Sequence, residues 1–353
     1  MLIRFSIENF LSFNDRQTFS LLPGLQRLKP EHKTSAVDGI SVLKTAVLFG
    51  ANASGKSNLI KAIAFGQNIV IMGTRPDKQI MYSKFKLDKN SHVNNSRIEY
   101  EIRHKDSNYA YGFIFNHQEI VEEWLYKIDS KKDTKIFERK SSAKEEFDLK
   151  NVLSLMKNEE ERSFFQFVAK ATPRNQLLLT EVRTRRVSDN VSGIDDLLNV
   201  IDWFQNVLRV ILPRGKYKEG VKYELKQDTN LLSEFEEFLD YFDTGIDGVC
   251  LEKVDEKNTD IPPMLISKLK EDLLSKKSNK VRATIVSNKN TTFFLSIKNN
   301  EVVIEKFMTK HKVKDTDTIE KFDTSEESDG TNRIMDFIPL LLDLLRGDNV
   351  FII

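Results

Sequence analysis

The feature that most constrains this chain is a glycine-rich segment at residues 50–58, Gly-Ala-Asn-Ala-Ser-Gly-Lys-Ser-Asn. The segment follows a nearly continuous apolar run from Val42 to Phe49, which predicts a strand buried on both faces at the centre of a sheet. It precedes Leu59, Ile60 and Ile63, whose spacing predicts an amphipathic helix. Strand, loop and helix in this order predict an α/β fold organised around the glycine-rich segment.

This segment matches the pattern Gly-x4-Gly-Lys-Ser in full, from Gly50 to Ser57. Glycines let the backbone turn tightly enough for several N–H groups to converge on phosphate oxygens, and the following helix adds the positive end of its dipole. Lys56 would hold the β- and γ-phosphates as a flexible positive charge, and Ser57 would place its hydroxyl on Mg²⁺. The pattern therefore predicts a site for ATP and Mg²⁺. Its nucleotide-binding residues are Gly50, Ala51, Asn52, Ala53, Ser54, Gly55, Lys56, Ser57 and Asn58.

Charge and cysteine content exclude several classes of protein. The 353 residues carry 54 basic and 53 acidic side chains, so no overall field draws the chain to nucleic acid or to an anionic membrane. Cys250 is the only cysteine, which excludes an internal disulfide and fits a reducing cytoplasm. The N-terminus does not resemble a secretion signal, and the most apolar stretch, residues 340–345, is far shorter than the ~20 residues that span a bilayer. We therefore expect a cytoplasmic protein without a membrane segment.

The spacing of apolar residues indicates how the rest of the chain is organised. Alternating apolar residues within 1–19 and 97–139 predict antiparallel strands, the second set forming a meander. Helical spacing prevails from about 150 to 245, and strand patterns resume between 283 and 307. The polar stretch at 312–327 predicts an exposed loop. We expect the N-terminal part of a nucleotide lobe at 1–150, a mainly helical insertion at 151–280 and the C-terminal part of the lobe at 281–353.

A family resemblance becomes visible at Asn9-Phe10-Leu11-Ser12-Phe13 and at Asn52 within the glycine-rich segment. The opening resembles the Asn-Phe-x-Ser-Phe strand pair at the head of SMC, RecF and OLD (overcoming lysogenisation defect) ATPases. Their phosphate loops usually contain Gly-x-Asn-x-Ser-Gly-Lys-Ser. The resemblance implies an α/β fold with an ABC-type P-loop nucleotide lobe, a mixed sheet that includes an antiparallel meander, and here a helical insertion.

A second motif lies near the other end, where Glu327-Ser328-Asp329-Gly330-Thr331-Asn332-Arg333 precedes a strongly apolar helix. Ser328 is a natural N-cap residue for that helix. The segment resembles the Ser-Asp-Gly-Thr-x-Arg form found in bacterial AAA-family ATP-binding proteins of abortive-infection and phage-defence operons. On that resemblance Ser328 and Gly330 form a signature-like segment that contacts phosphate in trans, across a homodimer assembled on ATP. Asp329 replaces the glycine that is usual in transporter heads.

Asn349-Val350-Phe351-Ile352-Ile353 resembles the start of the buried strand that ends in an Asp-Glu pair in such ATPases. In the family the Asp holds Mg²⁺ through water and the Glu orients the attacking water. The catalytic pair would follow Ile353, so we expect the chain to be truncated, to bind nucleotide and to lack efficient hydrolysis on its own. The γ-phosphate glutamine stays unassigned, because neither Gln67, Gln118 nor Gln176 has a distinctive context.

The resemblance implies an ATPase that dimerises on ATP and regulates a partner effector, a nuclease or toxin, in anti-phage defence. Two alternatives stay open. A DNA-repair or chromosome-structure head of the RecF or SMC kind would show DNA-stimulated hydrolysis, although residues 150–280 lack the heptads of SMC arms. A nucleotide-gated scaffold would bind ATP without turnover. The basic cluster Arg183-Thr184-Arg185-Arg186 leaves a nucleic-acid partner open.

Overall fold

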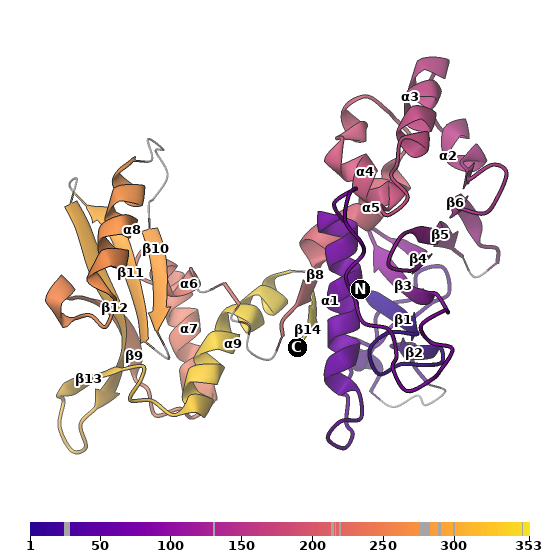
Figure 1. Cartoon of the computed structure of the whole chain (residues 1–353). Coiled ribbons are helices and arrows are strands. Elements are labelled where there is room, and N and C mark those ends of the chain that lie inside the picture. Colours follow the sequence, from indigo (N-terminus) through magenta and orange to yellow (C-terminus); the bar gives the residue numbers. More distant parts are fainter. Residues whose placement is uncertain are drawn as a thin grey trace. The chain divides into compact units, whose positions relative to one another are not determined.

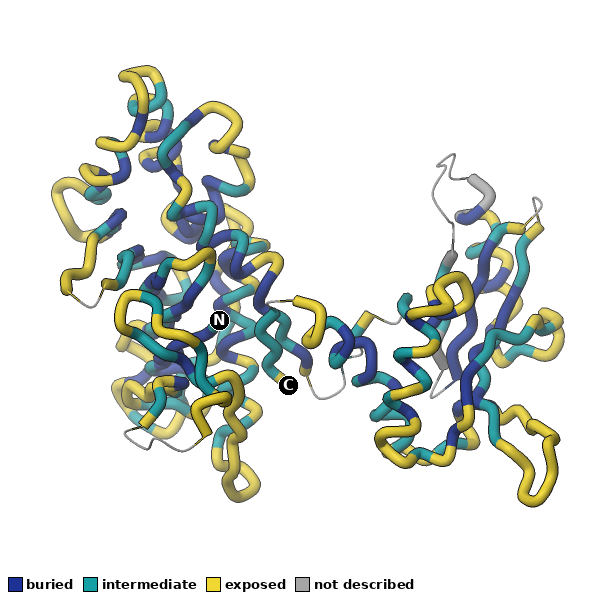
Figure 2. The backbone as a smooth tube through the Cα atoms, turned by 180° about the vertical axis from the view of Figure 1, so that it is seen from behind, coloured by how far each residue is buried: buried dark blue, intermediate teal, exposed yellow. Residues whose placement is uncertain are grey.

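The computed structural model divides into two compact units, Met1–Pro213 with Asp348–Ile353, and Arg214–Gly347 (Figure 1). The structure describes residues 1–24, 29–129, 131–212, 215, 217–218, 220–275, 283–288, 291–298, 301–347 and 349–353. Each unit is built on its own sheet. In Figure 2 the strands of both sheets are mostly buried or half-buried, whereas the loops between them are largely exposed.

The first unit contains a seven-stranded antiparallel sheet in the order β2-β1-β3-β4-β5-β6-β7. Its strands are β1 Leu2–Glu8, β2 Gln17–Ser20, β3 Ser96–His104, β4 Ser107–Phe115, β5 Ile120–Ile128, β6 Thr134–Lys140 and β7 Phe147–Asp148. Alternating burial along β3 shows why this sequence forms a strand with one inward face. The antiparallel meander predicted at 97–139 and the mixed α/β class are therefore confirmed.

Helix α1, Lys56–Met72, packs closely against this sheet. The Tyr100 hydroxyl donates a hydrogen bond to the Ile63 carbonyl over 2.8 Å, in a buried environment. A Cβ atom at Gly66 would overlap the Tyr100 side chain, so glycine permits this close approach. Phe5 on β1 lies 4.8 Å from Tyr100, ring centroid to ring centroid. The sheet and α1 thus share one aromatic-rich core.

Between residues 150 and 207 the first unit is mainly helical. This part contains α2 Lys150–Ser154, α3 Glu159–Lys170, α4 Leu178–Thr184, the 3-10 turn Val187–Asp189, α5 Asp195–Asp202 and the π-helical turn Trp203–Val207, and a further 3-10 turn, Pro30–His32, precedes α1. A short parallel pair joins β8, Leu208–Val210, to β14, Val350–Ile352.

The second unit has a sheet in the order β10-β11-β12-β13, with β9 also pairing with β12. Its elements are α6 Val221–Glu224, α7 Thr229–Tyr241, β9 Gly248–Lys253, the 3-10 turn Glu256–Asn258, α8 Pro263–Ser275, β10 Ala283–Asn288, β11 Thr291–Lys298, β12 Glu301–Lys312, β13 Ile319–Asp323 and α9 Asp329–Arg346. Phe294 and Phe307 face a core formed with α7 and α9. Phe293 and Leu295 face the core around α8, so helices cover both faces of this sheet.

Two expectations from the sequence are wrong. The apolar run Val42–Phe49 is not a buried strand: Val42 is buried, but Val47 and Phe49 are 70% and 86% exposed. The cause is that no strand of the described residues pairs with 45–49, and a strand needs a neighbour for its N–H and C=O groups. The stretch 312–327 is not wholly a loop, because β13 pairs with the end of β12, Thr309 opposite Phe322.

The compact units do not coincide with the boundaries at residues 150 and 280 that the sequence suggested. A compact unit is defined by contacts within the chain and not by function. The division into an ATPase lobe and a helical insertion therefore stays a prediction. No helix of the described residues is long and apolar enough to cross a membrane.

Candidate nucleotide-binding site

The glycine-rich segment forms a tight loop that ends where α1 begins. Gly55 is the N-cap of the helix and has φ 95°, a left-handed conformation that favours glycine. Ala53 also has positive φ, at 63°, which is a strained backbone for a residue with a Cβ atom. A Cβ atom at Gly50 would lie 2.7 Å from Ser54 Oγ. The path of the backbone therefore requires glycine at Gly55, whereas a side chain at Gly50 would have to displace the Ser54 hydroxyl.

The N-terminus of α1 is suited to an anion. Helices leave the N–H groups of their first turn without intrahelical acceptors, and here Gly55 offers no side chain to cap them. The first turn carries no acidic residue, and α1 is 17 residues long. Residues 50–54 and Ser57 are exposed, so a ligand can reach these groups. A phosphate at this position would meet the positive end of the helix dipole.

Lys56 directs its ammonium back into the loop. Nζ donates hydrogen bonds to the carbonyl oxygens of Gly50 and Ala51 over 2.6 and 2.8 Å, and lies 3.4 Å from Ser54 Oγ. The positive charge therefore already lies where the loop closes. Ser57 occupies the next helical position, with an exposed side chain that an Mg²⁺ ion could approach.

The Asn-Phe-x-Ser-Phe motif also has a clear structural role beside the loop. Asn9 is buried, and its Nδ2 donates to the carbonyl oxygens of Ser91 and Asn94 over 2.7 and 2.9 Å. Its Oδ1 accepts a hydrogen bond from the Phe85 N–H over 3.3 Å. Asn9 thus fixes residues 85–95 to the end of β1. Ser12 of the same motif has its Oγ 3.0 Å from the position that a Cβ atom would take on Gly55.

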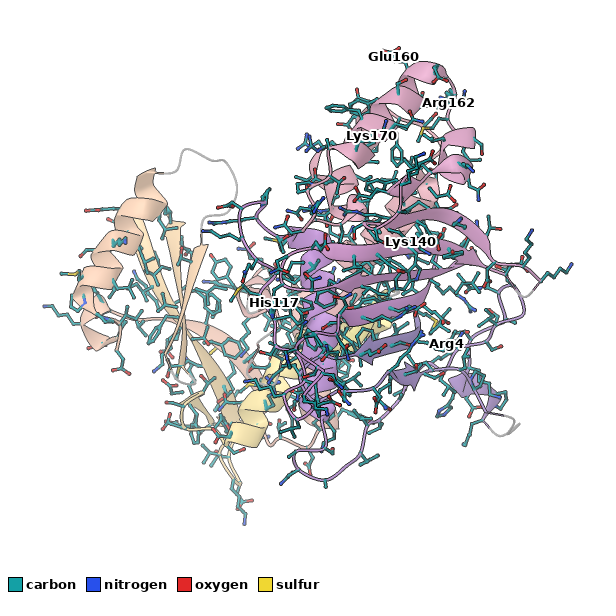
Figure 3. The ribbon with its side chains drawn as sticks, turned by 45° about the vertical axis from the view of Figure 1, so that its right-hand side comes forward. Arg4, His117, Lys140, Glu160, Arg162 and Lys170 are labelled. Carbon is teal, nitrogen blue, oxygen red and sulfur yellow. The ribbon has the colours of Figure 1, made fainter. Side chains whose placement is uncertain are left out.

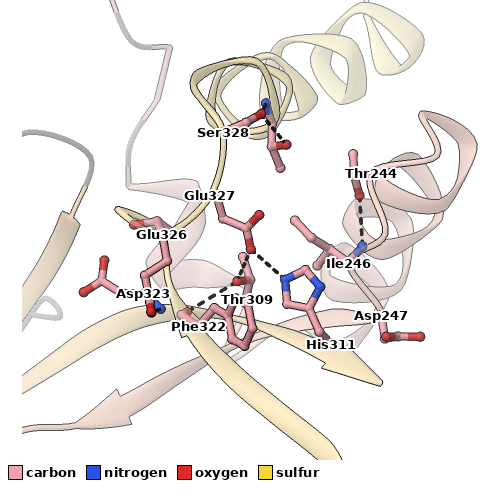
Figure 4. A network of polar contacts seen from close by, with 12 residues as sticks. Thr244, Ile246, Asp247, Thr309, His311, Phe322, Asp323, Glu326, Glu327 and Ser328 are labelled. Atoms are coloured by element: carbon pink, nitrogen blue, oxygen red, sulfur yellow. Dashed lines mark hydrogen bonds and ion pairs between the residues drawn. The ribbon is translucent and has the colours of Figure 1, made fainter. Parts of the chain in front are cut away.

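The signature-like segment lies in the second unit. Ser328 is the N-cap of α9, as predicted, because its Oγ accepts a hydrogen bond from the Thr331 N–H over 3.0 Å. Ser328 and Gly330 are both exposed. Just before them, Glu327 Oε1 accepts a hydrogen bond from Thr309 Oγ1 and lies 2.7 Å from His311 Nε2, which holds the segment against β12 (Figure 4).

The three glutamines left open by the sequence have different environments. Gln67 Nε2 donates to the carbonyl oxygens of Phe204 and Leu208, both over 2.8 Å. Gln176 is buried, and its Oε1 accepts a hydrogen bond from the Thr74 N–H. Both side chains are therefore engaged in holding the fold, and Gln118 is exposed on a turn. None of the three is singled out for the γ-phosphate.

Glu123 on β5 is a fully buried carboxyl group. It accepts hydrogen bonds from the Tyr111 hydroxyl over 2.9 Å and from the Leu178 N–H over 2.7 Å. Burial raises the pKa of Glu123 above its usual value of 4.5, although these hydrogen bonds and Arg139 oppose the shift. The group joins β5 to the start of α4 and stabilises the unit that carries the loop.

The comparison with known protein families gave a match within the first unit. Residues 46–180 match the family model described as AAA domain, putative AbiEii toxin, Type IV TA system. The match includes the glycine-rich loop, α1 and the meander up to the start of α4. No curated protein matches the chain. This part of the chain is similar to an AAA-type P-loop domain, and the match supports a nucleotide-binding protein of the ATPase kind.

Proposed function

We propose that the chain binds ATP with Mg²⁺ at residues 50–58 and that ATP binding assembles it into a homodimer. One observation carries the proposal: the full Gly-x4-Gly-Lys-Ser pattern lies at the uncapped N-terminus of α1, inside the matched region. That combination supplies N–H donors, a helix dipole and an ammonium group to one small volume.

The residues of the loop fit the ligand chemically. Backbone N–H groups from Gly55 to Ser57 would bind phosphate oxygens, and Lys56 would exchange its carbonyl partners for the phosphates. Ser57 would hold Mg²⁺ through its hydroxyl, which is an oxygen ligand of the kind that this ion prefers. The Mg²⁺ ion would neutralise charge on the phosphates. All of these roles concern the binding of ATP and Mg²⁺. We assign no residue of the chain to the activation of the water that attacks the γ-phosphate in hydrolysis.

Ser328 and Gly330 would complete the site from a second copy of the chain. The exposed start of α9 offers the Ser328 hydroxyl, which caps the Thr331 N–H, and further first-turn N–H groups that suit an anion, although Asp329 adds a negative charge to the same turn. We further propose that the dimer regulates a protein effector, a nuclease or toxin, in the cytoplasm. The name of the matched family, which refers to a putative toxin and a toxin–antitoxin system, supports this role. A nucleic-acid partner stays open.

The proposal is tested by light scattering with and without ATP and Mg²⁺, together with equilibrium ATP binding. We expect the mass to double with ATP. Lys56→Ala should lose both ATP binding and dimerisation, whereas Lys61→Ala, an exposed lysine on the same helix, should behave as the wild type. Ser328→Arg should bind ATP and stay monomeric. Unchanged ATP affinity in Lys56→Ala would refute the site, and an ATP-bound wild-type monomer would refute the dimer.

A further inference from the structure

A groove of about 430 Å³ lies between α7 and α9, which pack side by side in the second unit (Figure 1). Phe238 and Tyr241 of α7 line one side of it, and Leu342 and Leu345 of α9 line the other. Further side chains anchor both helices in the core of this unit, and among them Phe235 is fully buried. The groove is therefore held in place by the core and has apolar walls.

The apolar walls of the groove are open to solvent. Tyr241 is 79% exposed and Leu345 is 76% exposed. Phe242 extends this apolar surface at the end of α7, because its ring lies 5.3 Å from that of Tyr241 and 6.2 Å from that of Phe238, centroid to centroid. Single exposed apolar side chains are common on soluble proteins, but a group of them around one groove indicates an interaction site. Aromatic side chains are also enriched where proteins bind each other.

The unpaired charges at this end of α7 are negative. Arg346, a cation that lines the groove, forms an ion pair with Glu234 and links the end of α9 to α7. Glu237, which also lines the groove, is exposed, as are Asp240 and Asp243 further along the chain. None of these three carboxylates forms an ion pair with the part of the chain that the structure describes. Positive charge on the flanks of a ligand would therefore be favoured.

Helix α3 of the first unit shows why this charge matters. It also exposes an aromatic side chain, Phe167, which is 63% exposed. The charged residues along α3 have both signs, however, as Glu160, Arg162 and Lys170 in Figure 3 illustrate. A surface of that kind selects neither a basic nor an acidic partner, whereas the groove between α7 and α9 selects a basic one.

We propose that this groove receives an amphipathic, positively charged helix of a partner protein. A second copy of the chain would bring the same carboxylates together in a two-fold contact, and an anionic membrane surface would also be repelled. The inference rests on the proposed function for the role of the partner, a regulated effector. The groove itself does not involve the nucleotide.

The proposed contact follows the usual way in which a groove binds a helix. The bound helix presents apolar side chains at positions i, i+3, i+4 and i+7. Leucine or phenylalanine at these positions would pack against Tyr241 and Leu345 and cover them. Lysine or arginine on the flanks of the helix would face Glu237 and Asp240. Apolar contact would supply most of the affinity, and charge would select the partner.

The test uses two synthetic peptides and the full chain without nucleotide. Both peptides carry leucine at i, i+3, i+4 and i+7, and their other positions are mainly lysine in one and mainly glutamate in the other. Fluorescence anisotropy should show about tenfold tighter binding of the lysine peptide. Tyr241→Ala/Leu345→Ala should weaken that binding about tenfold. A matched control, Met264→Ala/Ile319→Ala, removes exposed apolar side chains of the same unit that do not line the groove, and it should bind as the wild type does.

A charge reversal guards this test against misfolded variants. Glu237→Lys/Asp240→Lys should bind the glutamate peptide more tightly than the lysine peptide, which a chain with a misfolded second unit would not do. Equal affinity of the wild type for both peptides, or unchanged affinity in Tyr241→Ala/Leu345→Ala, would overturn the inference. A nucleotide-free dimer that Tyr241→Ala/Leu345→Ala dissociates would also overturn it, because a second copy would then occupy the groove. A wild type that binds the lysine peptide but not ATP would refute the proposed function and leave the groove intact.

Discussion

Replacement of Glu123 provides a quantitative test of how the first unit is held together. Glu123→Ala leaves the Tyr111 hydroxyl and the Leu178 N–H buried without their acceptor. Each unsatisfied buried donor costs about 1–3 kcal/mol, so we expect the free energy of unfolding to fall by about 2–6 kcal/mol. Glu123→Gln keeps the shape, can accept from Leu178 and can donate to Tyr111, and should lose no more than about 1 kcal/mol.

The assay is urea unfolding followed by tryptophan fluorescence. The chain has two tryptophans, Trp124 and Trp203, and both are buried in the first unit, so the signal reports on that unit alone. A loss below about 1 kcal/mol in Glu123→Ala would refute the reasoning, because two buried donors cannot lose their acceptor at so small a cost. Equal losses in the Ala and Gln variants would show that the two acceptor oxygens of the carboxyl group, rather than side-chain shape, hold α4.

The same residue predicts a pH dependence of known sign. Because the folded pKa of Glu123 is raised, the folded state binds its proton more tightly than the unfolded chain does. The contribution of this group to stability is therefore fully present below the usual pKa of 4.5 and is lost as the pH rises through the folded pKa. Glu123→Gln should flatten the unfolding free energy over that interval. If the unfolding free energy of Glu123→Gln depended on pH in the same way as that of the wild type, the raised pKa of Glu123 would be contradicted.

Three further predictions concern the loop, α1 and α9. Gly55→Ala places a Cβ atom at φ 95° and should destabilise the loop by about 1–3 kcal/mol, which is visible as weaker ATP binding in calorimetry. Gly66→Ala should destabilise the first unit by about 1–3 kcal/mol in the fluorescence assay, because the new methyl group overlaps the Tyr100 side chain. The same change should cost less in a Tyr100→Leu background, where the overlapping ring is absent. Ser328→Ala removes the N-cap of α9 at a cost of about 1 kcal/mol, which should speed hydrogen exchange at the Thr331 amide, whereas Ser325→Ala should not.

The sequence predicted those elements of the fold that follow a repeating hydrophobic pattern or whose contacts are made by residues adjacent in the chain. Alternating residues identified the meander, and helical spacing after residue 58 identified α1, because each pattern reports which face is buried. The N-cap at Ser328 was predictable because cap and helix are adjacent in the chain. Val42–Phe49 was wrongly predicted as a buried strand, because an apolar run indicates a preference for burial but does not show which strand would pair with it.

Long-range contacts account for the rest. Asn9 was noticed as a motif residue, yet its partners, Phe85, Ser91 and Asn94, lie far along the chain and no spacing rule connects them. The segment at residues 85–95, which Asn9 holds, could not be connected to the Asn-Phe-x-Ser-Phe motif from the sequence for the same reason. The local sequence does not distinguish Glu123 from an exposed acidic residue, and its burial is visible only in the folded structure.

The position of the Lys56 ammonium changes how nucleotide binding should be pictured. Nζ already donates hydrogen bonds to the Gly50 and Ala51 carbonyls, so an incoming phosphate would have to displace these two acceptors. In the proposed site, binding would be an exchange reaction, in which the neutral carbonyl acceptors of Lys56 give way to anionic phosphate oxygens and return to water. The number of hydrogen bonds to the ammonium stays nearly constant, and the gain is the difference between a charged and a neutral acceptor. If phosphate binds as proposed, its affinity for this loop would therefore depend on the hydration of the Gly50 and Ala51 carbonyls as well as on the lysine itself.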